Sequence, residues 1–184
     1  LGLTGNTGIA AYGVVANVAL VATAVFNGIS QGSQPLLSDY YGKNDDKSVQ
    51  KILRLSIITG IAAAVLIILV TNLIPDVIVA VFNNENNAEM ASYAVFGVQL
   101  YFTGFLFAGF NIIGTGFLSA TESAAWAFIT SVLRGFVAIS LCALLLSALF
   151  GMTGVWLAFP VAEFITAVLM VIAIAQNVRK MRTK

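Results

Sequence analysis

The chain has 184 residues, of which 59% are hydrophobic and 9% charged, with a formal net charge of +1 and no histidine. Soluble domains carry about 25% charged residues, so this composition argues against a soluble globular protein. Ser-His and Cys-His catalysis and His-ligated metal sites are excluded, and the single cysteine excludes an internal disulfide. We therefore expect a membrane protein and not an enzyme, with no catalytic residue, no metal site and no nucleic-acid partner.

Five apolar segments, separated by short polar breaks, follow along the chain. A membrane span needs about 20 mostly apolar residues, and three charge-free windows are long enough on their own. Two later windows become spans if each accepts one charge, Arg134 or Glu163. The sequence thus predicts an all-α membrane protein with helices at about 8–35, 50–74, 88–118, 124–149 and 153–177. The predicted breaks are 36–49, 83–87, 121–123 and 151–154.

The basic residues gather at the breaks that one side of the membrane would share. Lys43, Lys47, Lys51 and Arg54 flank the first break, and Arg179, Lys180, Arg182 and Lys184 follow the last helix. The positive-inside rule makes that side cytoplasmic. We expect a multi-pass protein of the cell (cytoplasmic) inner membrane, in contact with membrane lipid, whose N-terminal residue lies outside and whose C-terminus is cytoplasmic. Because the chain starts outside and with Leu1 rather than Met, we also expect at least one preceding helix.

Two of the predicted helices carry a stripe of polar and small residues at helical spacing. In the first helix the stripe includes Asn17, Asn27, Gln31 and Gln34, which share one face. An unpaired amide that faces lipid costs several kcal/mol, so this face should meet protein or water. Hydrogen bonding between helices and a cavity wall are both open interpretations. The third helix has a similar stripe with Tyr101 and Asn111.

Two ionisable residues lie inside the predicted spans. Arg134 and Glu163 are each about ten residues into their helices, where a charge costs about 2.5–3.5 kcal/mol unless it is paired or hydrated. The helices form a tight antiparallel hairpin, so we hypothesise an ion pair or separate contacts to the rest of the protein. A structural clamp and a proton- or cation-binding role remain open alternatives.

The segment GISQGSQPLLSDYYGKN, residues 28–44, is the most distinctive motif. It resembles the G-x-x-Q-G-x-Q-P-L-x-x-x-x-Y-G signature of the multidrug and toxic compound extrusion (MATE) transporters. The upstream AAYGVVANV and the downstream GVWLAFPVAEF are similar to that family too. The signature positions are Gly28, Gln31, Gly32, Gln34, Pro35, Leu36, Tyr41 and Gly42.

The resemblance implies a transporter with two six-helix lobes, of which this chain is five helices of the C-terminal lobe and lacks the N-terminal lobe. It implies ion-coupled (H⁺ or Na⁺) antiport that exports organic cations by alternating access, with no cofactor beyond the coupling ion. The implied cavity wall holds Asn17, Asn27, Tyr101 and Asn111. The implied gate and turn hold Gln31, Gln34, Pro35 and Gly42.

The third helix carries neutral Asn111 where some family members carry an acid. We therefore expect ion coupling mainly in the other lobe, with Glu163 as a secondary position. Two alternatives remain. One is a lipid-linked sugar flippase of the same superfamily, and the other is a non-transporting five-helix membrane scaffold.

Overall fold

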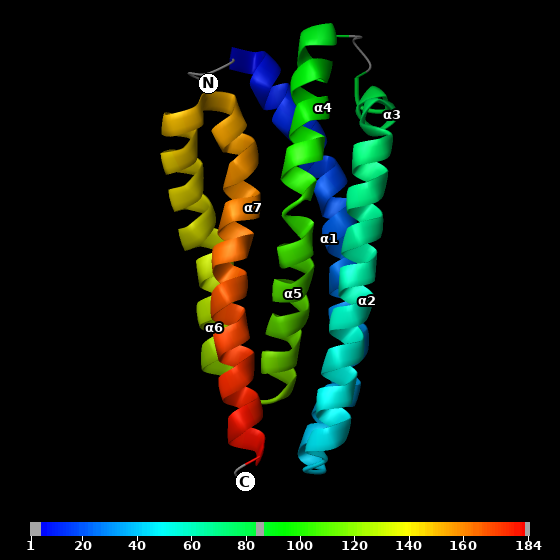
Figure 1. The fold of residues 1–184 in the computed structure, drawn as a ribbon, viewed down its shortest axis with the longest axis vertical. Coiled ribbons are helices and arrows are strands. Elements are labelled where there is room, and N and C mark those ends of the chain that lie inside the picture. Colours follow the sequence, from blue (N-terminus) through cyan, green and yellow to red (C-terminus); the bar gives the residue numbers. More distant parts are fainter. Residues whose placement is uncertain (1–4, 84–86, 183–184) are drawn as a thin grey trace.

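The computed structural model describes residues 5–83 and 87–182, and every regular element in this part is a helix. The helices lie along one long axis and form an elongated bundle (Figure 1). Their bounds are α1 Gly5–Gly42, α2 Asp46–Leu73, α3 Pro75–Ala80, α4 Ala88–Phe102, α5 Phe105–Ala120, α6 Ala124–Val132, the π-helix η1 Leu133–Ala138, and α7 Ile139–Arg182.

The described helices are long and apolar enough to cross a membrane in three places, Gly5–Gly42, Asp46–Leu73 and Ala124–Met181. The pair α4 and α5, bent by 49°, is a fourth if it is counted as one span. The third stretch is interrupted at Gly151, whose φ of 58° and ψ of −133° are not helical. The chain reverses direction there, so that α7 returns beside α6 (Figure 1). The all-α membrane fold is confirmed, whereas the count of five spans stays a prediction.

The first predicted break is much shorter than expected. Residues 36–49 were expected to form a polar connection, but α1 continues through Pro35 to Gly42 and α2 begins at Asp46. Leu37 explains the difference, because its side chain is fully buried in a cluster with residues of α2, α5 and α7. The remaining turn ends at Asp45, which caps α2 by accepting hydrogen bonds from the Ser48 backbone N–H at 3.1 Å and the Ser48 hydroxyl at 2.6 Å.

The predicted third helix, 88–118, is also not continuous. It divides into α4 and α5 at Thr103 and Gly104. Gly104 lies so close to α7 that a Cβ atom there would be 2.7 Å from the Phe159 ring and 2.9 Å from the Pro160 Cα atom. The break therefore lies at a point of close contact with α7. The predicted connection at 83–87 falls largely on residues outside the described part.

Helices α4 and α5 occupy the centre of the bundle, where they contact α1, α2 and α7. Glycines on their faces allow this close packing. A Cβ atom at Gly97 would be 2.7 Å from the Trp156 indole, and one at Gly109 would collide with the Phe26 ring. Both of these large side chains are fully buried, so α4 packs closely against α7 at Gly97 and α5 packs closely against α1 at Gly109.

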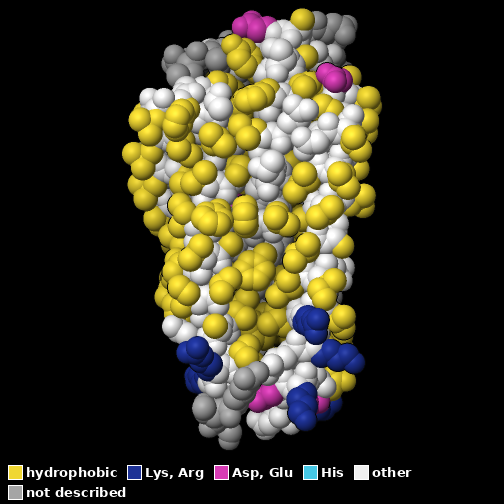
Figure 2. Space-filling view, in the orientation of Figure 1, with side chains coloured by type: hydrophobic (Ala, Val, Ile, Leu, Met, Phe, Trp, Pro, Cys, Tyr) yellow, Lys and Arg dark blue, Asp and Glu magenta, His cyan; other side chains and the backbone are white. Residues whose placement is uncertain are grey.

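The outer surface of the bundle is apolar over most of its length. Large hydrophobic side chains such as Leu20, Leu66 and Leu144 are more than 60% exposed. Figure 2 shows hydrophobic side chains over the middle of one face and Lys and Arg side chains at the end where the C-terminus lies. A surface of this kind suits lipid contact in the middle and water at the end.

Candidate functional site

Three polar side chains from three helical segments meet inside the apolar bundle. Arg134 lies in η1, Glu163 in α7 and Asn111 in α5. The Arg134 Nε atom donates to Glu163 Oε1 at 2.6 Å, and Asn111 Nδ2 donates to Glu163 Oε2 at 2.7 Å and to the Glu163 carbonyl at 2.9 Å. The predicted ion pair of Arg134 with Glu163 is therefore present in the structure.

Burial differs sharply between the two charged side chains. The Glu163 side chain is 4% exposed and the Arg134 side chain 27% exposed. A buried carboxylate needs both a counter-charge and hydrogen-bond donors, and Glu163 has one of each. The charge of Arg134, in contrast, lies at the edge of the bundle.

The π-helix η1 was not foreseen. It covers Leu133–Ala138, and Arg134 is its second residue. A π-helical turn is wider than an α-helical turn and is often found at functional sites. The sequence contains no hydropathy signal for it, since a π-turn changes the hydrogen-bond register and not the composition.

Asn111 takes a different place from the one expected. Its side chain is fully buried, because its amide is held between α5 and α7 by the two bonds to Glu163. It packs against Glu163 between the two helices, and it lines none of the three cavities described below. Its Oδ1 atom is buried without a hydrogen-bond partner among the described residues.

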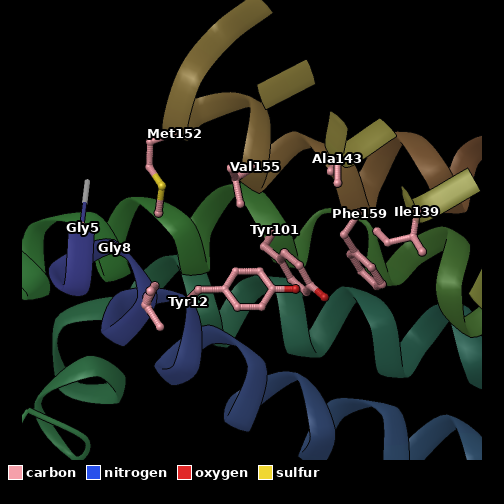
Figure 3. Close-up of a pocket in the computed structure, with 11 residues that line it drawn as sticks. Gly5, Gly8, Tyr12, Tyr101, Ile139, Ala143, Met152, Val155 and Phe159 are labelled. Atoms are coloured by element: carbon pink, nitrogen blue, oxygen red, sulfur yellow. The ribbon is translucent and has the colours of Figure 1, made fainter. Parts of the chain in front are cut away.

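A cavity of about 330 Å³, lined by aromatic and small apolar residues, lies between α1, α4 and α7 (Figure 3); we call it the aromatic cavity. Tyr101, predicted for the cavity wall, lines it together with Tyr12, Met152 and Phe159. The Tyr101 and Phe159 rings stack with centroids 4.2 Å apart and an interplanar angle of 7°. Figure 3 shows Tyr12 reaching from α1 toward Tyr101. Sequence reasoning missed Tyr12 and Phe159, which the fold brings to Tyr101 from distant parts of the chain.

Two further cavities continue from the aromatic one. The central cavity, about 280 Å³, shares Ile139 and Phe159 with it and is also lined by Arg134 and Glu163. The polar cavity, about 250 Å³, shares Arg134 and Gly135 with the central one. We call these three cavities together the groove. Their linings come from α1, α4 and α7 at the apolar end and from α1, α5, α6 and η1 at the polar end, with Arg134 in the lining of both the central and the polar cavity.

The amides of α1 differ in whether they border the groove. Asn27, Gln31 and Gln34 line the polar cavity, although Asn27 and Gln31 are exposed residues. The two glutamines predicted for the gate therefore border the groove from within helix α1 and do not lie in a turn. Asn17 is exposed and donates to the Gly13 carbonyl at 2.8 Å, and it lines none of the three cavities.

The other two predicted gate residues, Pro35 and Gly42, are exposed residues of α1 that line no part of the groove. A metal site is not suggested by the described residues either, which contain no group of three or more His, Cys, Asp and Glu side chains near one another.

The family model described as MatE matches residues 1–144. Among curated relatives, the multidrug export protein MepA of Staphylococcus saprophyticus is 27% identical over 165 residues, which are 89% of this chain and 35% of that protein. MepA of Staphylococcus haemolyticus is 29% identical, over 90% of this chain and 36% of that protein. The chain thus spans about a third of the length of these relatives.

Solved structures share the fold. A MATE multidrug resistance transporter in the outward-facing conformation matches with a TM-score of 0.93 at 11% identity, over 99% of this chain and 41% of that one. The Vibrio cholerae MATE transporter VcmN in its bent form matches with a TM-score of 0.90 at 16% identity, over 97% and 40%. The family model covers well over half of the chain, and the fold agrees with it: the chain belongs to the MatE family of transporters.

Proposed function

We propose that this chain is part of a multidrug exporter in which an H⁺ or Na⁺ gradient drives the exit of organic cations by alternating access. Membership of the family and the names of the relatives support export. The observation that carries the proposal is the ion pair of Arg134 and Glu163, since it places a buried carboxylate beside a groove.

The aromatic cavity is the proposed place for the substrate. Tyr12, Tyr101 and Phe159 offer ring faces, and aromatic faces attract cations by about 0.5–2 kcal/mol, more when the cation is desolvated. Such a cavity selects for a flat, lipophilic cation and tolerates variation in its shape.

Glu163 is the proposed point of ion coupling in this part of the protein. A proton or Na⁺ that reaches the central cavity competes with Arg134 for the carboxylate. Once displaced, the guanidinium adds an unpaired positive charge to the groove, in a cavity that shares Phe159 with the aromatic one. Since like charges repel strongly at low dielectric, ion entry favours release of a cationic substrate, which is the requirement for antiport.

The orientation and the second lobe are part of the same proposal. We place the basic end of the bundle in the cytoplasm and the N-terminal end of α1 outside. The face of α1 that carries Asn17 is open: a Cβ atom at Gly13, Gly28 or Gly32 would meet nothing within 4 Å. This open face supports the proposal that α1 contacts the N-terminal lobe. The two lobes would then rock against each other at that contact.

The test is transport by the full-length protein in proteoliposomes, with ethidium as the probe and with an imposed pH gradient, Na⁺ gradient or neither. We expect ethidium movement that depends on one of the two gradients and is lost in Glu163→Gln. Glu89→Gln, an exposed residue of the first turn of α4, is the matched control and should keep full transport.

Each other outcome has a clear meaning. Ethidium transport that survives Glu163→Gln would place the coupling ion elsewhere and leave the ion pair a structural clamp. No gradient-driven movement of ethidium by the wild-type protein would overturn cation antiport. Lipid-linked sugar translocation in the same vesicles would then support the flippase alternative. Absence of both kinds of transport would support the scaffold alternative.

A further inference from the structure

We propose that the polar cavity is a binding site for an oxyanion, a carboxylate or a phosphate group, which the free edge of the Arg134 guanidinium holds. This inference goes beyond the export of cations, because Arg134, the one charged described residue in the lining of this cavity, repels a cation. It rests on the donors that the cavity presents and on the charge of its wall.

Arg134 has unused donors. A guanidinium carries five N–H groups in a planar fork. In Arg134 the Nε–H group donates to Glu163. Within the described part of the chain, no hydrogen bond engages the remaining guanidinium N–H groups. Arg134 lines the central cavity, which Glu163 also lines, and the polar cavity, whose lining does not include Glu163. The Arg134 side chain therefore borders open space in the polar cavity as well as contacting Glu163. The fork matches the two oxygens of a carboxylate or phosphate.

The rest of the polar cavity adds neutral donors. Asn27, Gln31 and Gln34 come from α1 and Ser131 from α6. None of these four side chains forms a hydrogen bond with another described residue in the structure. Their amides and hydroxyl are therefore available to a ligand in the polar cavity.

No acidic group competes at the wall. Among the described residues that line the polar cavity, none is Asp or Glu, and Arg134 is its one charged member. The Glu163 carboxylate, which lies outside this lining, partly offsets the positive charge of Arg134. It also accepts a hydrogen bond from Asn111. This arrangement lowers the net attraction and keeps Arg134 oriented, so we expect selective but weak binding of small anions.

The size of the cavity suits a head group and not a whole lipid. Water occupies about 30 Å³ per molecule in the liquid, so about 250 Å³ accommodates several heavy atoms. An anionic lipid with its chains in the bilayer and a soluble anion offer the same chemistry to Arg134. The experiment has to separate these two sources.

The experiment is calorimetric titration of the purified full-length protein in a neutral detergent. The probes are inorganic phosphate and a short-chain phosphatidic acid, with the matching short-chain phosphatidylcholine as the zwitterionic reference. We expect saturable binding of phosphatidic acid or of phosphate, and weaker or no binding of phosphatidylcholine. Binding of both anions assigns a general oxyanion site, and binding of phosphatidic acid alone assigns a lipid head-group site.

Variants link the binding to the polar cavity. Arg134→Lys keeps a charge for Glu163 but loses the fork, and we expect about tenfold weaker binding, as for one lost charge-assisted hydrogen bond. Gln31→Ala leaves the ion pair untouched and should also weaken binding. Gln176→Ala, an exposed residue of α7 outside the groove, is the matched control and should bind as the wild type does.

Two results would overturn the proposal: neither anion binds the folded wild-type protein, or both variants bind as tightly as Gln176→Ala does. Both results concern binding alone. They are therefore distinguishable from a failure of ion-coupled transport, which the ethidium assay measures.

Discussion

Removing Arg134 should destabilise the protein more than neutralising Glu163, although both changes break the same ion pair. The reason is the difference in burial: Glu163 is 4% exposed and Arg134 27% exposed. Arg134→Ala leaves a buried carboxylate with Asn111 as its remaining side-chain donor. Glu163→Gln leaves a guanidinium that still borders the central and polar cavities.

The magnitudes follow from these two end states. Loss of one partner of a buried pair costs about 3–5 kcal/mol, which we expect for Arg134→Ala. In Glu163→Gln the amide oxygen still accepts a hydrogen bond from the charged guanidinium. The other carboxylate oxygen becomes an NH2 group, so the charge-assisted bond from Asn111, worth about 1.5–3 kcal/mol, is lost or replaced by a neutral bond worth about 0.5–1.5 kcal/mol. We therefore expect a loss of about 1–2 kcal/mol, so that the two variants differ by about 2 kcal/mol.

The assay is reversible unfolding of the purified protein in mixed micelles, with the free energy of unfolding measured for wild type, each variant and the double variant Arg134→Ala/Glu163→Gln. The double variant should be more stable than Arg134→Ala alone, because no carboxylate is then left unpaired. Arg54→Ala, at an exposed position, should stay within about 0.5 kcal/mol of wild type. Equal losses in the two single variants, or a greater loss in Glu163→Gln, would refute the reasoning from burial.

Three further predictions use other parts of the fold. Gly109→Ala should cost about 1–3 kcal/mol of unfolding free energy by overpacking, because its Cβ would collide with Phe26, whereas Gly28→Ala has open space and should be neutral or stabilising; similar effects at both sites would contradict the packing. Asn177→Ala should cost about 1–2 kcal/mol, since Nδ2 donates to two hydroxyls at the α5–α6 connection, and a stability equal to wild type in the same assay would show that those bonds contribute nothing. Hydrogen bonds from the first turn of α2 lower the pKa of Asp45, so its contribution is complete above the unfolded pKa of about 3.9 and is lost as pH falls through the lower folded value. Protection of the amides in that turn, measured as exchange relative to the intrinsic rate at each pH, should therefore fall in acid for wild type and stay constant for Asp45→Asn. A parallel fall in both would count against this cap.

The sequence was sufficient for the membrane character and the helical class, and it gave the pairing of the two intramembrane charges as one of two alternatives. Apolar runs and the cost of a charge in hydrocarbon are local properties that each residue carries into any fold. Arg134 and Glu163 stood out because each interrupted an apolar window, and the tight connection between their helices brought them together. The signature at residues 28–44 indicated the family for the same reason, since it is read directly from consecutive residues.

The sequence was insufficient where a helix continues, bends or widens. Pro35 lies within α1 because Leu37 is buried against neighbouring helices. The division between α4 and α5 lies where Gly104 contacts α7, and η1 changes the backbone register around Arg134. Each of these depends on contacts between segments distant in sequence.

At the candidate site the difference between what the sequence determines and what the tertiary structure determines is clearest. Composition and periodicity determined that polar side chains would line part of the bundle, because amides and charges cannot face lipid without partners. Only the tertiary structure decided that Asn111 packs against Glu163, that Tyr12 and Phe159 join Tyr101, and that Asn17 stays outside the groove. Periodicity places a residue on a face of its own helix, whereas burial depends on which other helix covers that face.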